Sequence, residues 1–204
     1  MKLVFASNNA HKLAEVRAIM PAGVEVLSLQ EVGFESEIEE TGATLEENSL
    51  IKAEAVYQWL STFNVQRSSF ILDGVFADDT GLEIDALGGK PGVYTARWAG
   101  EPAANRKKAL AELADKTNRE AQFRTVITLM MHSADSPQPS VTQVEGVVRG
   151  RIATEEYGEG GFGYDPVFIP EGYDKTFGEL PAELKNQISH RARALQQLVK
   201  LLNR

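Results

Sequence analysis

Apolar and polar residues alternate in recognisable blocks along the first part of the chain. Residues 2–6 form a short apolar run that predicts a strand, and the polar residues 7–9 follow it. Apolar residues then recur at helical spacing over residues 13–20, up to a proline at position 21. The pattern predicts a strand, a polar loop and a helix, with a second strand over residues 24–29.

A capping box gives the next signal. Thr44 is a favourable N-cap residue and Glu47 lies three positions later, which predicts a helix that runs through Ile51, Ala55 and Trp59. Residues 70–87 then contain two apolar, strand-like pieces. We expect these pieces to lie on either side of an acidic turn at residues 78–81.

The second half of the chain mixes strand and helix signals. Turn residues predict a loop, alanine and leucine predict a helix, apolar runs predict strands, and Ser189 is a candidate cap for a last helix. The predicted elements are a loop over 88–92, a helix over 103–114, strands over 121–131, 141–152 and 167–169, and a helix after Ser189. This mixture indicates an α/β or α+β fold without internal repeats.

The segment GEGGFGYDPVF, residues 158–168, matches the G-x-G-x-x-G spacing of dinucleotide-binding loops. That motif needs a strand before the glycines and a helix after them, whereas a proline and a strand-like run follow here. Two interpretations remain open. In the first, the glycines form a simple connection between strands. In the second, they let the backbone approach a flat or anionic ligand, with Phe162 or Tyr164 stacking and Asp165 adding a polar contact.

Composition and charge narrow the possible functions. The chain has 204 residues, 43% of them hydrophobic, which suits one domain or two joined lobes with a sizeable core. It has no cysteine, which excludes disulfides and thiolate chemistry, and no apolar run long enough for a signal peptide or a membrane span. A soluble, cytoplasmic protein is expected. The net charge of −8 argues against nucleic-acid binding, so a small anion would need local cations or a metal.

Residues Ser7, Asn8, Asn9, Ala10, His11 and Lys12 lie where the first strand is predicted to turn into a helix. Free backbone N–H groups and the positive end of the helix dipole meet Lys12 there, which suits a phosphate. The alternative is an ordinary capped helix with a solvent-facing lysine.

Asp78 and Asp79 are the leading metal candidates. Successive side chains of a strand point to opposite faces, so one aspartate is the better ligand unless the chain bends. Glu39 or Glu40 could add a second carboxylate for Mg²⁺, and a solvated acidic turn is the alternative.

A cationic group near the last helix is formed by Lys185, His190 and Arg191, with a charged helix cap as its simplest interpretation. The chain has three histidines, so a catalytic triad or a histidine metal cluster is poorly supported.

Five segments, in order, resemble the inosine/xanthosine triphosphate pyrophosphatase family. They are SNNAHK (7–12), EETGATLEENSLIKA (39–53), FADDTGLEIDALGGKPGVYTARWAG (76–100), GGFGYDPVF (160–168) and ISHRARAL (188–195). Together they extend over nearly the whole chain. Thr80 stands where the family often has serine, and TAR at 95–97 replaces the commoner SAR.

The resemblance implies an α/β fold with a long mixed β-sheet flanked by helices, forming a single domain over residues 1–204. That domain has two lobes with the active cleft between them, and the protein is a homodimer. It also implies Mg²⁺-dependent hydrolysis of deaminated purine nucleoside triphosphates, which clears them from the nucleotide pool. A related pyrophosphatase for other modified nucleotides and a non-catalytic nucleotide-sensing module remain as alternatives.

The resemblance also assigns roles to individual residues. Glu39 and Asp79 would hold the metal, and Asp79 would act as the proton acceptor. The remaining residues would bind substrate: Ser7, Asn8, Asn9, Ala10, His11, Lys12, Thr80, Phe162, Gly163, Tyr164, Asp165, Lys185, His190 and Arg191.

Overall fold

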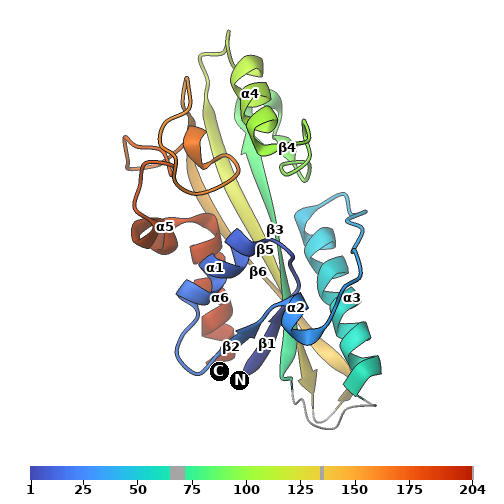
Figure 1. The fold of residues 1–204 in the computed structure, drawn as a ribbon. Helices are drawn as coiled ribbons and strands as arrows, with labels where there is room; N and C mark the ends of the chain where they lie inside the picture. The colour runs from blue at the N-terminus through green and yellow to red at the C-terminus, as the bar shows by residue number, and fades with distance from the viewer. Residues whose placement is uncertain (65–71, 134–135, 204) are drawn as a thin grey trace. The chain divides into compact units, whose positions relative to one another are not determined.

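The computed structural model describes residues 1–64, 72–133 and 136–203, and the chain forms two compact units. The first unit contains Met1–Asp79, Val126–Glu145 and Ala194–Arg204. The second contains Thr80–Thr125 and Gly146–Arg193. Each unit therefore consists of segments that are distant in sequence (Figure 1).

The strands form one mixed sheet with the order β2-β1-β3-β5-β6-β7, and β4 pairs with β3 off this path. The strands are β1 (Lys2–Phe5), β2 (Glu25–Leu27), β3 (Gly74–Ile84), β4 (Lys90–Gly92), β5 (Glu120–Ser133), β6 (Ser136–Ile152) and β7 (Phe168–Pro170). Strand β1 is parallel to β2 and β3, whereas the pairs β3–β4 and β6–β7 are antiparallel. The expected long mixed sheet is confirmed.

Six α-helices and two short 3₁₀ segments accompany the described strands. They are α1 (Ala10–Ile19), α2 (Leu29–Val32), α3 (Leu45–Asn64), α4 (Pro102–Glu112), α5 (Ala182–Ile188), α6 (His190–Leu202), η1 (Asp85–Leu87) and η2 (Asp165–Val167). Within the described ranges, none of the helices combines the length and apolarity needed to cross a bilayer.

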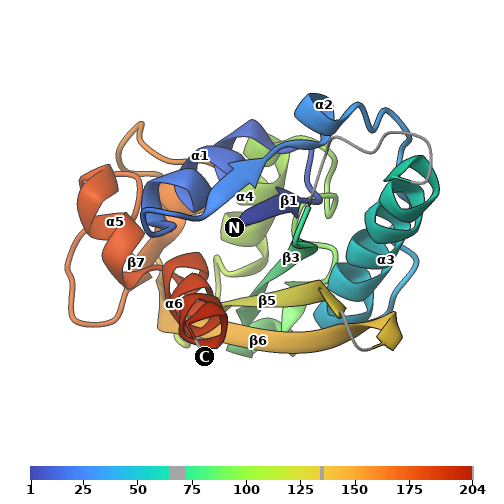
Figure 2. The same cartoon turned by 90° about the horizontal axis from the view of Figure 1, so that it is seen from below.

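The first unit packs helices on both faces of its strands. Val75 and Ala77 of β3 belong to an apolar cluster with α3, whereas Phe76 belongs to a second cluster with α1 and α6. Figures 1 and 2 show α3 on one side of the first half of β3 and α6 on the other. Because side chains alternate along a strand, neighbouring residues of β3 contact different helices.

The second unit has its own core, which combines aromatic rings with aliphatic side chains. Phe168 of β7 lies 4.7 Å from the ring of Phe123 and 5.6 Å from that of Phe177, measured between ring centroids. Leu113, which follows α4, and Val167 are fully buried in the same cluster. The same cluster includes Val148 and Ile152 of β6, so it packs the end of the segment 158–168 against that strand.

The predicted acidic turn at residues 78–81 is wrong. Residues 74–84 form a single strand, β3, in which Asp78 and Asp79 are buried. Each aspartate has a lysine partner inside the protein, which offsets the cost of burying its charge and lets the strand continue. Phe70, which belonged to the predicted strand region, lies outside the described residues.

Other elements also have different boundaries in the structure from those predicted. Residues 88–92, predicted as a loop, contain the short strand β4, which pairs with β3. Strand β5 ends at Ser133, whereas β6 begins at Ser136, within the polar region at 133–140. The short helices α2 and α5 were not expected, whereas α1, α3, α4 and α6 confirm the predicted helices.

Candidate active site

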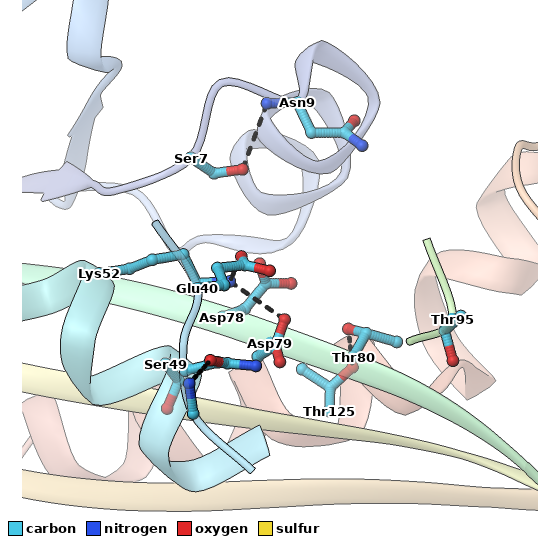
Figure 3. A network of polar contacts seen from close by, with 12 residues as sticks. Ser7, Asn9, Glu40, Ser49, Lys52, Asp78, Asp79, Thr80, Thr95 and Thr125 are labelled. Atoms are coloured by element: carbon cyan, nitrogen blue, oxygen red, sulfur yellow. Dashed lines mark hydrogen bonds and ion pairs between the residues drawn. The ribbon is translucent and has the colours of Figure 1, made fainter. Parts of the chain in front are cut away.

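Five charged residues of the first unit form a buried group that we name the carboxylate–lysine cluster: Asp78, Asp79, Glu40, Lys12 and Lys52. The Lys12 Nζ lies 2.8 Å from Asp78 Oδ1. The Lys52 Nζ lies 2.6 Å from Glu40 Oε1 and 3.1 Å from Asp79 Oδ1. Figure 3 shows the Lys52 side chain directed at both of its carboxylate partners. Three carboxylates are thus gathered around two ammonium groups.

Strand alternation explains which lysine each aspartate meets. Asp79 continues the side of β3 that packs against α3, and its partner Lys52 is a buried residue of α3. Asp78 continues the side occupied by Phe76, and its partner Lys12 lies in the first turn of α1. The two aspartates therefore serve two different ammonium groups, as the pleat predicts.

The loop before α3 places Glu40. The Gly42 N–H donates to the Asn48 Oδ1 at 2.8 Å, which ties the loop to the first turns of the helix. A Cβ on Gly42 would lie 2.6 Å from Glu47 Cβ and 2.7 Å from Asn48 Oδ1, so the loop has no room for a side chain there. This close fit fixes the position of the residues that precede it.

The helix start itself is only partly the predicted capping box. The Thr44 Oγ1 accepts from the Glu47 N–H at 3.1 Å, as expected. The Glu47 carboxylate, however, accepts from the Ala43 N–H at 2.6 Å rather than from that of Thr44.

The cluster changes the proton affinity of its members. Burial raises the pKa of Asp79 above its ordinary value, although Lys52 and Lys12 partly oppose this effect. Burial disfavours the charge on Lys52, but the carboxylates of Asp79, Asp78 and Glu40 outweigh it and raise the pKa of Lys52. Lys52 is therefore charged at neutral pH, and Asp79 is more basic than an exposed aspartate.

One atom of the cluster suits a further ligand. Asp79 is 7% exposed, and its Oδ2 is buried without a hydrogen-bond partner among the described residues. A buried carboxylate oxygen with no partner is costly, and hard divalent cations such as Mg²⁺ prefer oxygen ligands of this kind. Among the described residues, no three or more metal-ligating side chains are grouped so that they could hold a metal ion. A cation at Asp79 therefore needs further ligands that do not come from such a group.

Glu39 and Glu40 occupy different environments. Glu39 is exposed, whereas Glu40 is half-buried and contacts Lys52. The geometry therefore favours Glu40 over Glu39 as the carboxylate that works with Asp79.

The segment 7–12 forms a capped helix start. The Asn9 Oδ1 accepts from the Lys12 N–H at 3.1 Å, and the Asn9 N–H donates to the Ser7 Oγ at 3.2 Å. Asn8, Asn9, Ala10 and His11 are exposed. The Lys12 side chain is only 16% exposed, so the alternative of a solvent-facing lysine is wrong.

The second unit contains a separate group around an aromatic ring, here named the Phe162 cluster: Phe162, Asp165, Lys185, Arg191 and Thr80. The Lys185 Nζ is buried 2.6 Å from Asp165 Oδ2 and lies 4.7 Å from the centroid of the Phe162 ring. The Arg191 guanidinium lies 5.6 Å from the same centroid. Two cations therefore face one half-buried aromatic ring, an arrangement suited to an electron-rich ligand.

Thr80 and His190 complete the surroundings of this group. Arg191 donates to the Thr80 Oγ1 at 3.4 Å, and the Thr80 and Thr125 hydroxyls lie 2.7 Å apart. The His190 ring stacks on Phe123 at 4.6 Å between centroids. Ser189, predicted as a cap, accepts from the Ala192 N–H at 3.2 Å and so fixes the start of the helix that carries His190 and Arg191.

The glycine-rich segment is a connection between β6 and β7, as one interpretation predicted. No strand lies immediately before Gly158 and no helix of the dinucleotide-binding kind follows Gly163 within this described segment, which excludes the Rossmann interpretation. Gly158 and Gly161 have positive φ angles, and a Cβ at these positions would clash with Gly178 and Asp165 respectively. The absence of a side chain at these glycines thus lets the Gly178 backbone and the Asp165 carboxylate lie close to them.

Tyr164 does not offer a stacking face. It is 3% exposed in the core of the second unit, and its hydroxyl donates to the Thr95 carbonyl at 3.2 Å. Burial raises the pKa of Tyr164 far above its ordinary value. Phe162 is therefore the aromatic residue of this segment that suits base stacking.

The sequence analysis did not identify Lys52 and Asn48 as residues of the site. Both are buried on the side of α3 that also carries Ser49, Ala53 and Val56. A polar residue at a position that shares a helical face with apolar ones is the signal that could have identified them.

Comparison with known proteins places the chain in a family. The Ham1 family model matches residues 3–201. A dITP/XTP pyrophosphatase of Flavobacterium johnsoniae is 46% identical over 99% of this chain and 98% of its own length, and the one of Bacillus subtilis is 47% identical over 98% and 96%. The Ham1 protein of Staphylococcus aureus has a TM-score of 0.82, with 40% identity over 100% of this chain and 98% of that one. These matches confirm the resemblance found in the sequence, and the chain belongs to the Ham1 family.

Proposed function

We propose that this protein hydrolyses deaminated purine nucleoside triphosphates, namely the inosine, deoxyinosine and xanthosine forms, to the monophosphate and pyrophosphate. Relatives that match over nearly their full length are named dITP/XTP pyrophosphatases. The observation that carries the proposal is the buried Asp79 carboxylate, which has one oxygen without a partner among the described residues and sits beside two ammonium groups. Such a group combines a base with the cations that a triphosphate requires.

The carboxylate–lysine cluster is assigned to the phosphates. Lys12, at the start of α1, and Lys52 supply positive charge, and the exposed residues 8–11 lie at a helix N-terminus, where an anion is favoured. This local charge lets a protein with a net charge of −8 bind a polyanion.

Asp79 and Glu40 are assigned to the metal, with Glu39 kept as the alternative to Glu40. When bound, Mg²⁺ neutralises phosphate charge and polarises a phosphoryl oxygen. Asp79 accepts the proton of the attacking water, and its raised pKa makes it a better base than an ordinary aspartate.

The Phe162 cluster is assigned to the base. Phe162 stacks on the purine, while Lys185, Arg191 and a protonated His190 can donate to a 6-keto oxygen. Adenine carries a 6-amino group that itself donates, so it leaves these donors unpaired. A site built on one hydrogen-bond pattern can reject the other by about 10⁴-fold or more.

We further propose that residues 1–204 act as a single catalytic domain, that the protein is a cytoplasmic homodimer, and that it acts on free nucleotides rather than on nucleic acid. The net charge of −8 supports the last point, because long polyanions are repelled.

A pyrophosphate-release assay over a panel of purine and pyrimidine triphosphates, with and without Mg²⁺, tests the proposal. We expect turnover of inosine and xanthosine triphosphates, with adenosine triphosphate nearly inert and guanosine triphosphate excluded less strongly. Preferential turnover of other modified nucleotides would indicate the related pyrophosphatase. Nucleotide binding without pyrophosphate release would indicate a sensing module.

A further inference from the structure

Lys52 occupies the place between the two carboxylates assigned to the metal. Its ammonium lies 2.6 Å from Glu40 Oε1 and 3.1 Å from Asp79 Oδ1, distances at which it donates to both. Its side chain is 10% exposed, as is that of Asp79. The ammonium thus holds together the two groups that a cation would also hold.

A divalent cation on Glu40 and Asp79 and the Lys52 ammonium compete for the same negative charge. Asp79 Oδ2 has no hydrogen-bond partner in the part of the chain that the structure describes, so the carboxylate can take another ligand, but a cation there would lie beside a buried ammonium. Like charges this close in a protein interior repel strongly. A lysine on a flexible four-carbon stem can relieve the repulsion by moving to a different anion.

We propose that Lys52 is a place-holder for the metal: it neutralises Glu40 and Asp79 in the free protein and leaves them when a cation binds. This inference rests on the proposed function, because it assumes that these carboxylates hold the cation. A triphosphate supplies the anion to which the released ammonium can turn. Cation and nucleotide binding are then positively coupled, so the free protein binds metal weakly and the two ligands bind best together.

The closest contacts support an exchange at Lys52 rather than at Lys12. Lys12 pairs with Asp78, which lies on the opposite side of β3 from Asp79. Removing Lys52 therefore takes one ammonium partner away from both assigned ligands at once. Removing a surface charge elsewhere changes the net charge equally and frees neither.

The experiment measures Mn²⁺ binding to nucleotide-free protein by electron paramagnetic resonance, with the melting temperature as a second readout. We compare the wild type with Lys52→Gln and with Lys107→Gln, an exposed lysine in α4 that serves as the control. Lys52→Gln should bind Mn²⁺ roughly 5–150-fold more tightly than the wild type, the usual range for coupled sites. Mn²⁺ should also raise its melting temperature more than that of the wild type, whereas Lys107→Gln should match the wild type.

Equal Mn²⁺ affinity in the wild type and Lys52→Gln would overturn the place-holder role while leaving the metal ligands in place. Absence of Mn²⁺ binding in every variant, even with inosine monophosphate and pyrophosphate added, would overturn both the role and the ligand assignment. The nucleotide panel tests turnover independently of these results.

A measurement on the wild type covers the case in which Lys52→Gln does not fold. The ¹⁵N signal of a buried, ion-paired ammonium is visible by nuclear magnetic resonance, and Lys52→Arg identifies it. Saturating Mg²⁺ should shift or broaden that signal as the ammonium leaves its carboxylates. An unchanged signal at saturation would show that ammonium and cation coexist, which contradicts the proposal.

Discussion

At the scale of single residues, buried charge is balanced within small groups. The carboxylate–lysine cluster has one more carboxylate than ammonium groups, and one of its buried oxygens, Asp79 Oδ2, has no hydrogen-bond partner among the described residues. Replacing one member changes the charge that its neighbours experience. Substitutions that keep the shape but remove the charge are therefore the most informative.

Asp79→Asn should reduce kcat by about 10²–10⁴-fold, because it removes the proposed base. The amide is nearly isosteric, and circular dichroism should show an unchanged fold. A folded variant with wild-type turnover would remove Asp79 from the mechanism.

Glu40→Gln and Glu39→Gln form a matched pair. Because Glu40 is half-buried beside Lys52 and Glu39 is exposed, only Glu40→Gln should raise the Mg²⁺ concentration needed for half-maximal activity, by about 10-fold or more. Titrating Mg²⁺ at fixed inosine triphosphate measures this. The reverse order would restore Glu39 as the ligand.

Lys185→Met tests recognition of the base. Loss of one charged donor should lower the preference in kcat/KM for inosine over adenosine triphosphate by about 10–100-fold. It also leaves Asp165 buried with less compensation, so the melting temperature should fall. Lys175→Met, an exposed position in the same unit, should preserve both preference and stability. An unaltered preference in folded Lys185→Met would exclude this lysine from base recognition.

At the scale of elements, the site depends on how strands and helices meet their loops. The alternation of β3 directs Asp78 and Asp79 to different helices, and the tight start of α3 places Glu40. The loop before α3 is the least tolerant of these connections, because the Gly42 backbone contacts the helix directly.

Gly42→Ala should cost about 1–3 kcal/mol of stability, since its methyl group overlaps Glu47 and Asn48. The shifted loop should also raise the Mg²⁺ concentration needed for half-maximal activity, as expected for Glu40→Gln. Thermal unfolding and the Mg²⁺ titration measure the two effects, with Asn48→Ala reporting loss of the hydrogen bond alone. Wild-type stability in Gly42→Ala would show that the loop can move away freely.

Periodicity and motifs predicted much of this arrangement. Apolar spacing and capping residues predicted the helices at 10–19 and 190–202. The same pattern predicted that Lys12 lies at the start of the first helix. The prediction of an acidic turn was wrong, because consecutive aspartates followed by a glycine resemble a solvated turn unless the buried partners of the aspartates are known. Lys52 was missed for the same reason: its partners lie 12 and 27 positions away in sequence.

At the scale of the whole molecule, buried titratable groups link folding to pH. The pKa of Tyr164 is raised in the folded protein because burial disfavours the phenolate. In the unfolded chain the phenol ionises near pH 10. Unfolding therefore releases a proton above that pH, so this stability is complete below about pH 10 and is lost as the pH rises.

Tyr164→Phe should consequently lose less stability than the wild type between about pH 9 and 11.5. At neutral pH it should be less stable by about 0.5–1.5 kcal/mol, because the hydrogen bond to the Thr95 carbonyl is gone. Melting temperatures across this range measure the difference. Parallel curves for the two proteins would contradict the assigned role of Tyr164.

The chain passes from one unit to the other after Asp79, Thr125, Glu145 and Arg193, three times within a strand and once within α6. Neither unit therefore corresponds to one uninterrupted stretch of gene. A recombination event that exchanges a single continuous segment cannot replace one unit and leave the other whole. A crossover after Asp79 would separate the residues assigned to the phosphates from those assigned to the base, but it would also divide the core of the first unit, which includes residues of β5 and α6. New specificities are therefore expected to arise by point substitution rather than by shuffling of modules.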